Sequence, residues 1–242
     1  MRIGRDTTAD GRVPGRRDTG RRGDPAAALT HGRAPARIEP ADLSDRLVTG
    51  AILVDTREPR TFGAGHVAGS LNVWIDAPQF GERVSWFVPP DATLVVLSET
   101  QGDVDRALPA LARVGLSDVA GFLVGTAAVR ACGLPLGTLA NVSAAELADR
   151  LARDRDLLVL DVRESVEWAG GHVSGARHIP MREVSVRIDE VPRDRTVAIA
   201  CAGGARSSLV GSMLLARGFT DLLNVWGGMT GWAQADLPTT GD

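Results

Sequence analysis

The sequence predicts an α/β fold made of two small parallel sheets, each flanked by helices. Three observations support this prediction. Short apolar runs alternate with segments of helical periodicity, the two halves of the chain repeat each other, and 44% of the 242 residues are apolar. Alternating strands and helices are typical of parallel sheets with right-handed crossovers. A chain of this length and composition can fill two cores of about a hundred residues each.

The repeat is visible in two short motifs. The motif Asp-x-Arg-Glu occurs at residues 55–58 and again at 161–164, and Gly-His-Val-x-Gly occurs at 65–69 and again at 171–175. Both motifs return after 106 residues. Two motifs that return with one common spacing indicate a duplicated domain rather than a short local repeat.

We therefore predict two domains, at residues 38–137 and 138–242. Residues 1–37 precede them and contain nine Arg and four Asp but few apolar side chains. Such a leader cannot bury enough apolar surface to fold, so we expect it to be disordered. A nucleic-acid-binding arm is the alternative, and the lack of interleaved aromatic residues argues against it.

Each domain is expected to open with a helix that is followed by a buried strand. The helix start is clearest in the second domain, where Ser143 and Glu146 have the spacing of a capping box. The apolar strands that follow are Ile52–Asp55 in the first domain and Leu157–Asp161 in the second. Further short strands alternate with helices to the end of each domain.

The most informative stretch lies in the second domain. Val197–Ala200 is an apolar run typical of a buried parallel strand. Ser207–Arg217 has helical periodicity, and Gly218 is placed to end that helix. The loop between them starts with Cys201, contains two glycines and leads to Arg206. Its backbone N–H groups therefore meet at a helix N-terminus, which favours anions and, together with Arg206, the thiolate form of Cys201.

The composition excludes several other kinds of function. Cys132 and Cys201 are the only cysteines, so we expect no disulfide framework and a reducing compartment, the cytoplasm. Cys132 aligns with Ala235 in the repeat and is interpreted as inert. No apolar stretch is long enough to span a membrane. Neither a membrane, nor a nucleic acid, nor a metal or other cofactor is therefore expected.

The second domain carries the motifs of a known family. Asp161-x-Arg163-Glu164 is followed by Gly-His172-Val-x-Gly and by Cys201-x-x-Gly-x-Arg206-Ser. With these motifs, residues 38–242 resemble a tandem of rhodanese domains. More narrowly, the loop Cys-Ala-Gly-Gly-x-Arg-Ser-Ser resembles the rhodanese halves of bacterial fusions to metallo-β-lactamase-fold persulfide dioxygenases. The His-x-His-x-Asp cluster of the dioxygenase half does not occur in this sequence, so such a half is absent or on another chain.

The resemblance implies a sulfurtransferase without a cofactor. Cys201 would take the outer sulfur of a donor as a cysteine persulfide and pass it to a thiol or to cyanide, with Arg206 as the second catalytic residue. The donor would be a small persulfide or thiosulfate, and a separate persulfide-metabolising enzyme is the protein partner that the resemblance implies. The loop residues assigned to substrate binding are Ala202, Gly203, Gly204 and Ala205.

The first domain serves as an internal control for these assignments. In the repeat, Ser98 takes the place of Cys201, and Asp103 that of Arg206. A serine cannot form a persulfide and a carboxylate repels an anion, so we predict that the first domain is inactive. The Asp, Arg and His of the repeated motifs persist there although the chemistry is lost. We therefore interpret Asp161, Arg163 and His172 as structural, with His172 as a general base as the alternative.

Residues outside the loop are less strongly marked. In the thiosulfate- and mercaptopyruvate-type tandem enzymes that the chain also resembles, an Arg stands where this chain has Glu167. We assign Glu167 to the substrate pocket, where its charge would disfavour a dianionic donor. Arg182 and Trp226 are further candidates for this pocket because each lies next to a predicted strand end.

The first domain also contains an aromatic segment without a counterpart in the second. It comprises Phe80, Trp86 and Phe87. We expect this segment to pack against the neighbouring domain or a partner.

Two alternative functions stay open. Related cysteine phosphatases have a longer loop between nucleophile and arginine, whereas four residues separate Cys201 from Arg206 here. A non-catalytic sulfur-carrier, sensor or scaffold module is the other alternative. The presence of Cys201 in the second domain argues against a sensor or scaffold, since the first domain shows that this residue can be lost.

Overall fold

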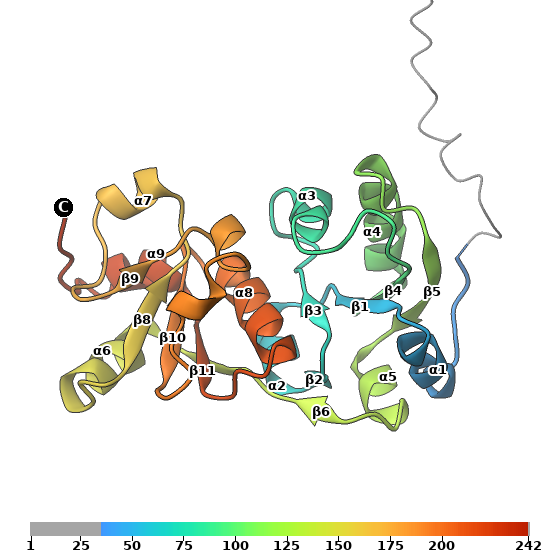
Figure 1. The fold of residues 1–242 in the computed structure, drawn as a ribbon, viewed down its shortest axis with the longest axis horizontal. Helices are drawn as coiled ribbons and strands as arrows, with labels where there is room; N and C mark the ends of the chain where they lie inside the picture. Colours follow the sequence, from blue (N-terminus) through green and yellow to red (C-terminus); the bar gives the residue numbers. More distant parts are fainter. Residues whose placement is uncertain (1–34, 242) are drawn as a thin grey trace, which may run out of the picture.

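The computed structural model describes residues 35–241, which form two α/β domains that lie side by side along the long axis of the molecule (Figure 1). Each domain contains a parallel sheet with helices packed on it, which confirms the predicted fold class. Of the leader that we predict to be disordered, residues 1–34 lie outside the described part of the chain.

The first domain is built on a four-stranded parallel sheet with the strand order β3-β1-β4-β5. Its strands are β1 (Ile52–Asp55), β3 (Leu71–Asn72), β4 (Leu94–Ser98) and β5 (Val119–Val124). Its helices are α1 (Leu43–Val48) after the 3-10 turn η2 (Pro40–Asp42), α2 (Pro59–Ala64), α3 (Phe80–Ser85), α4 (Gln101–Arg113) and α5 (Thr126–Ala131). A short antiparallel pair, β2 (His66–Val67) with β6 (Leu136–Gly137), closes the domain.

The second domain repeats this plan with one more strand, in the order β7-β11-β10-β8-β9. Its strands are β7 (Ala140–Val142), β8 (Leu158–Asp161), β9 (Arg177–His178), β10 (Val197–Ala200) and β11 (Leu222–Val225). Its helices are α6 (Ala144–Arg153), α7 (Ser165–Ala169), α8 (Ala205–Ala216) and α9 (Gly228–Gln234), with the 3-10 turns η3 (Met181–Glu183) and η4 (Ile188–Glu190). The predicted capping box of Ser143 and Glu146 opens α6.

The strand registers show that the repeat is structural. In the first sheet Asp55 lies beside Leu97, and in the second sheet Asp161 lies beside Ala200. The next residues along the chain are Ser98 and Cys201, which therefore occupy equivalent places at the carboxyl ends of β4 and β10. Ligand sites of open α/β sheets lie at this edge.

Several element boundaries differ from the prediction: β8 begins at Leu158 rather than Leu157, and α8 ends at Ala216 rather than Arg217. The second domain opens with β7 rather than with a helix, because this three-residue strand pairs with β11 near the end of the chain and no local pattern marks it. The helix after Cys201 begins at Ala205, since Gly204 has a φ of 107° and forms its N-cap. Arg206 therefore lies in the first turn of α8. The predicted helix stop at Gly218, which has a φ of 83°, is confirmed.

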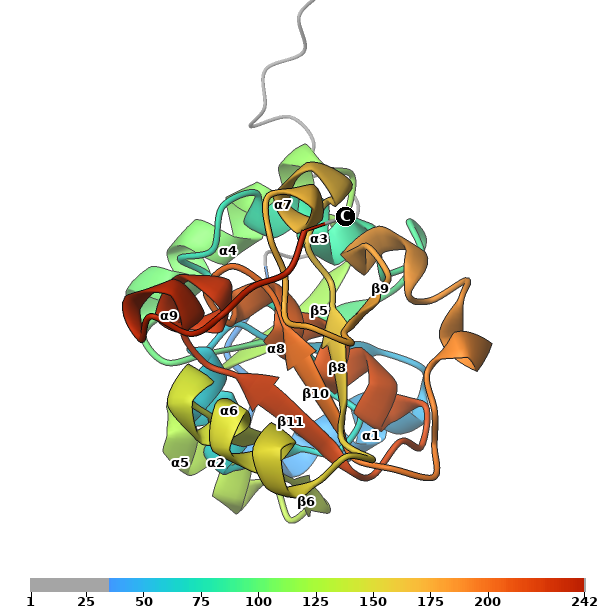
Figure 2. The same ribbon diagram turned by 90° about the vertical axis from the view of Figure 1, so that its left-hand side faces the viewer.

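Helix α8 lies between the two domains. Figures 1 and 2 show it on the side of the second sheet that faces the first domain, with α6 on the opposite side. All residues from Ser207 to Leu214 are buried, which is typical of a helix covered on every side. Asn72 of β3 fixes it: its Oδ1 accepts from the Ser208 hydroxyl at 2.5 Å, and its N–H donates to Ser212 Oγ at 2.9 Å. The first domain thus covers the helix that follows Cys201.

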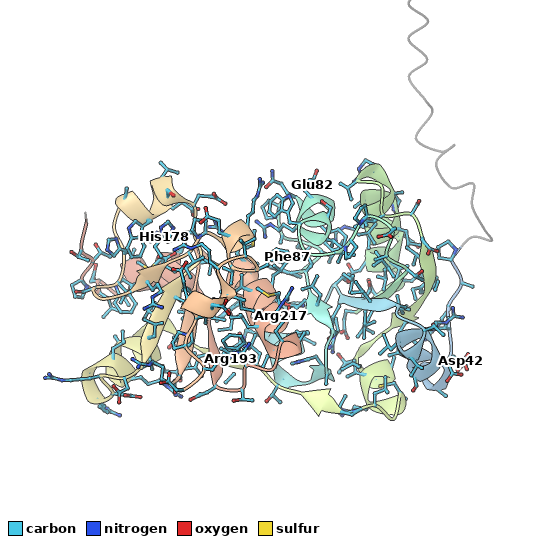
Figure 3. All side chains as sticks on the ribbon, in the orientation of Figure 1. Asp42, Glu82, Phe87, His178, Arg193 and Arg217 are labelled. Atoms are coloured by element: carbon cyan, nitrogen blue, oxygen red, sulfur yellow. The ribbon has the colours of Figure 1, made fainter. Side chains whose placement is uncertain are left out.

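The aromatic segment of the first domain follows its prediction in part. Phe87 and Arg217 (Figure 3) line a cavity of about 190 Å³ between the domains. The ring of Trp86 lies against Arg182 of the second domain. For Phe80 the prediction is wrong, because its side chain lies between α3 and α4 inside the first domain.

Candidate active site

Cys201 lies at the carboxyl end of β10 and is almost fully buried. Its Sγ accepts a hydrogen bond from the Gly204 N–H at 3.0 Å and lies 3.4 Å from the Ser207 hydroxyl. Both partners belong to the start of α8. The sulfur is therefore held at the N-terminus of a helix, where partial positive charge favours an anion.

The loop carbonyls fix the direction of the loop amides. Three successive carbonyls accept hydrogen bonds from the start of α9: that of Cys201 from Met229 at 2.8 Å, that of Ala202 from Thr230 at 3.0 Å, and that of Gly203 from Gly227 at 3.3 Å. In a trans peptide the N–H points away from the C=O of the same unit. The amides of Ala202, Gly203 and Gly204 therefore point away from α9, and that of Gly204 reaches the sulfur.

Two glycines make this arrangement possible. A Cβ on Gly204 would lie 2.8 Å from the Trp226 ring, and its φ of 107° also disfavours other residues. A Cβ on Gly228 would lie 2.1 Å from the Cys201 carbonyl oxygen. A Cβ on Gly203, which the repeat aligns with Thr100, would meet no atom within 4 Å. The close packing of the Trp226 ring thus depends on Gly204, and the close approach of α9 to the loop backbone depends on Gly228.

Arg206 is held by an ion pair. Its Nη1 and Nη2 donate to the two carboxylate oxygens of Glu167 at 2.6 and 2.7 Å. These hydrogen bonds lower the pKa of Glu167 below its ordinary value. The expectation that the Glu167 carboxylate repels a dianionic donor therefore loses its basis, because this carboxylate neutralises Arg206. Its assignment to the substrate pocket stays a prediction.

In the first domain, the helix start that corresponds to the Cys201 loop is capped by side chains of the domain itself. Thr100 and Asp103 form a capping box at the start of α4. The Asp103 carboxylate accepts from the Thr100 N–H at 3.1 Å and from its hydroxyl at 2.7 Å. Ser98 bonds to the Thr56 hydroxyl at 2.7 Å. In the first domain, the helix start that corresponds to that of α8 is thus occupied by a carboxylate of the domain itself. By contrast, no described side chain caps α8.

Residues 39–127 and 143–235 both match the family model of the rhodanese-like domain. The chain belongs to the rhodanese-like domain family. A sulfurtransferase of Allochromatium vinosum is 37% identical over 98 residues, which are 40% of this chain and 92% of that relative. The thiosulfate sulfurtransferase GlpE of Glaesserella parasuis is 27% identical over 88 residues, 36% of this chain and 82% of that relative.

Among solved structures, the thiosulfate sulfurtransferase of Pseudomonas aeruginosa is similar over 85% of this chain and 43% of its own, with 23% sequence identity and a TM-score of 0.40. The two curated rhodanese relatives each match only about two fifths of this chain, a length close to that of one domain.

The three rhodanese motif residues that we interpret as structural have the same contacts in both domains. Arg163 pairs with Asp161 at 2.7 Å and donates to the Gly171 carbonyl at 2.8 Å, and Arg57 does the same with Asp55 and Gly65. The His172 ring stacks on Trp168 with centroids 3.4 Å apart, as His66 stacks on Phe62 at 3.8 Å. Equal geometry in a domain without the cysteine supports a structural role.

Arg182 and Trp226 both face the first domain. The Arg182 guanidinium lies 3.7 Å above the ring centre of Trp86. Trp226, which packs on Gly204, lies 6.5 Å from Trp74, measured between ring centroids. No pattern in the sequence marks Trp74 as a neighbour of the site. The only signal for this interface was the aromatic segment that the second domain lacks.

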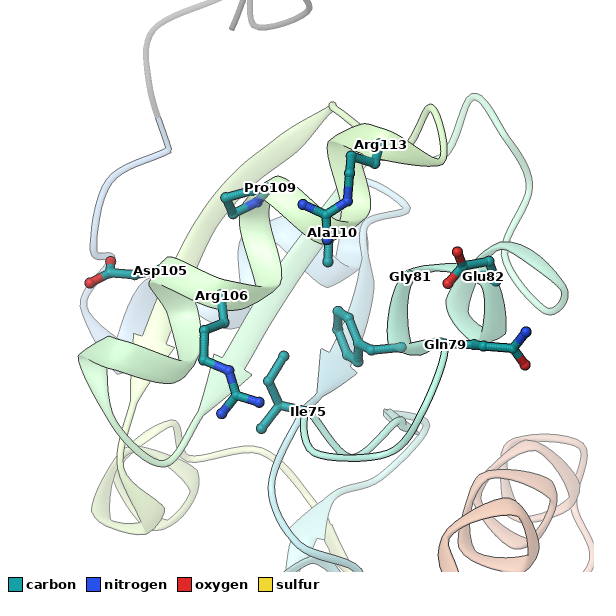
Figure 4. Close-up of a pocket in the computed structure, with 10 residues that line it drawn as sticks. Ile75, Gln79, Gly81, Glu82, Asp105, Arg106, Pro109, Ala110 and Arg113 are labelled. Carbon is teal, nitrogen blue, oxygen red and sulfur yellow. The ribbon is translucent and has the colours of Figure 1, made fainter. Parts of the chain in front are cut away.

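The cavity shown in Figure 4 lies elsewhere, between α3 and α4 of the first domain, and has a volume of about 650 Å³. Neither Cys201 nor Arg206 lines it. Within residues 35–241, no cluster of His, Cys, Asp and Glu has the arrangement of a metal site, and no described helix is long and apolar enough to cross a membrane. Cys132 is buried, and its thiol donates to the Val129 carbonyl.

Proposed function

We propose that the second domain transfers sulfane sulfur by way of a persulfide on Cys201. The observation that carries this proposal is the hydrogen bond from the Gly204 N–H to Cys201 Sγ at a helix end that no described side chain caps. A negative charge on this sulfur, or on a sulfur bonded to it, is favoured by backbone N–H groups and the helix dipole. Such a site stabilises a persulfide anion without a metal or an acid.

The first half-reaction forms the persulfide. The Cys201 thiolate attacks the outer sulfur of the donor and forms an S–S bond, while the bond between that sulfur and the rest of the donor breaks. With thiosulfate, sulfite leaves with the bonding electron pair and Cys201 becomes a persulfide anion. With glutathione persulfide, the glutathione thiolate leaves. Neither case needs an external oxidant or reductant.

The second half-reaction returns the enzyme to its starting state. An acceptor thiolate or cyanide attacks the outer sulfur of the persulfide, and the Cys201 thiolate leaves with the electron pair. Cyanide becomes thiocyanate in this step, which gives a convenient assay. Arg206, fixed by Glu167, shapes the entrance of the loop for donor and acceptor.

Family membership and the relatives named as sulfurtransferases support this function over that of a cysteine phosphatase. A thiol is the acceptor that we propose for the cell, and a separate persulfide-metabolising enzyme is the proposed partner. A non-catalytic sulfur carrier would form the same persulfide but would not turn over, so the two functions differ in one measurable step.

The test uses the purified full chain with thiosulfate and, separately, with glutathione persulfide. We expect mass spectrometry to find one added sulfur atom on Cys201 and cyanide to release it as thiocyanate over many turnovers. Cys201→Ser should abolish both signals, and Cys132→Ser, the matched control, should keep them. Turnover that survives Cys201→Ser would refute the proposal. A persulfide that forms without turnover would identify a carrier.

A further inference from the structure

The positive charge near Cys201 is not where the sequence analysis placed it. Because Arg206 gives both of its Nη groups to Glu167, the pair is neutral as a whole. A second guanidinium lies at the boundary between the two domains, on the side of the first domain. It belongs to Arg83 of α3, the helix that Figure 1 shows between α4 and the second domain.

The face of α3 that carries Arg83 is turned toward the second domain. Arg83 and Trp86 are three residues apart and therefore share one face of this helical segment. Trp86 lies under the Arg182 guanidinium at 3.7 Å, which places this face at the domain boundary. Trp74 and Trp226 meet across the same boundary, and Trp226 packs on Gly204, whose N–H holds the sulfur.

Arg83 has no anionic partner among the described residues. Its Nε is buried and meets no hydrogen-bond acceptor in the described part of the chain. The buried Arg57 and Arg163, by contrast, each pair with an Asp. The Arg83 residue as a whole is half-buried, but an enclosed Nε–H without an acceptor costs stability. An enclosed, unpaired Nε at the same domain boundary as the Cys201 loop points to a binding role for Arg83.

The electrostatics agree with this placement. Burial lowers the pKa of Arg83 below its ordinary value, and the charge of Arg206 lowers it further, whereas Cys201 raises it. Arg83 is thus within electrostatic reach of both active-site residues. Together, Arg83, Arg206 and Glu167 leave one net positive charge beside the sulfur.

We propose that Arg83 of the first domain binds the anionic end of the sulfur donor at Cys201. The preferred donor is then a sulfane sulfur attached to an oxyanion, with thiosulfate as the simplest example. Its outer sulfur points to Cys201 and its sulfonate oxygens face the planar guanidinium, whose N–H groups match an oxyanion. This inference rests on the proposed sulfur transfer, and it gives the inactive domain a direct part in it.

The first test measures donor kinetics on the full chain. Arg83→Gln should raise the KM for thiosulfate about tenfold or more, with a much smaller change for glutathione persulfide, because one charge-assisted contact is lost. Arg113→Gln, an exposed arginine of the same domain, should behave like the original protein. Equal KM values for Arg83→Gln and Arg113→Gln would overturn the proposal.

The second test does not depend on sulfur transfer. In a Cys132→Ser background, Cys201 is alkylated with anionic iodoacetate and with neutral iodoacetamide, and the ratio of the two rates reports the local charge. Arg83→Gln should lower this ratio about fivefold or more, Arg83→Lys should restore most of it, and Arg113→Gln should leave it unchanged. The same ratio of rates in Arg83→Gln and in the protein with Arg83 would overturn the inference. A protein that shows the expected ratio but no transfer with either donor would instead refute the proposed function.

Discussion

Replacing Gly228 by alanine should inactivate the site through the backbone alone. Gly228 is the first residue of α9, has a φ of 51° and is buried. An added Cβ would lie 2.1 Å from the Cys201 carbonyl oxygen and 2.7 Å from the carbonyl carbon of Ala202. Both contacts are to backbone atoms, which cannot rotate away as a side chain can. The loop that holds the thiol must therefore move.

The size of this movement follows from the contact. Real Cβ atoms essentially never come within 3.0 Å of such a neighbour, so the Cys201 carbonyl must shift by about 0.9 Å. A displacement of about 1 Å at a reacting group can cost about a hundredfold in rate. The left-handed backbone adds a stability cost of about 1–2 kcal/mol for a residue with a side chain. In a chain of this size that lowers the Tm by a few degrees, about 2–4 °C for each kcal/mol.

Gly218→Ala provides the matched control. Gly218 also has a positive φ, 83°, but an added Cβ would meet no atom closer than 3.9 Å. Gly218→Ala should lose only the stability cost of the positive φ, whereas Gly228→Ala should lose more because of its clash, and only Gly228→Ala should lose about a hundredfold in thiocyanate production. The assays are a melting curve and kcat/KM with thiosulfate and cyanide. If Gly228→Ala melts like Gly218→Ala and keeps full activity, the α9 contacts do not hold the loop.

Three further predictions follow from the contacts of the two domains. Glu167→Gln should cost about 0.5–1 kcal/mol at neutral pH, a value reduced by solvent because the Glu167 side chain is 32% exposed. Because folding lowers the pKa of Glu167, the stability difference between the two proteins is fully present above about pH 4.5, the ordinary pKa of Glu. Urea titrations should show this difference vanish as the pH falls through the lowered pKa of the folded protein. Ser98→Cys in a Cys201→Ser background should restore no thiocyanate release, because Thr100 and Asp103 still close the start of α4; any turnover would contradict this. A fragment of residues 138–242 should be far less soluble or less stable than the full chain, because its α8 loses its cover; a fragment that melts like the full chain would show that this cover is unnecessary.

Local patterns predicted most of the second domain. The apolar run before Cys201, the capping box of Ser143 and Glu146 and the stop at Gly218 each depend on neighbours in the chain, and all three are present. The repeat identified Ser98 as the counterpart of Cys201, and the strand registers confirm this alignment. Such features can be predicted because the residues that form them are close together in the sequence.

Contacts between distant segments were not predictable in this way. Glu167 and Arg206 are 39 residues apart, and no spacing rule connects an early helix of a domain with a later one. Without that contact, Glu167 looked like a free negative charge. Arg83 was missed for a stronger reason: it belongs to the domain that lacks the cysteine, so the repeat gave no cause to search there. Only the packing of α3 against the second domain brings it to the site.

The same features that suit the second domain for the proposed sulfur transfer make it depend on the first. Helices α4 and α8 follow equivalent strands, yet they are built differently. In α4 only Val104, Ala107 and Leu111 are buried, and a capping box satisfies its N-terminus. In α8 every residue from Ser207 to Leu214 is buried and no described side chain caps its start. An uncapped helix end leaves polar groups free for a bound anion but costs stability. A helix without a polar face must also be covered on both sides. The first domain provides this cover through Asn72 and the shared core, which gives a domain without the cysteine a structural role beside the one that carries it.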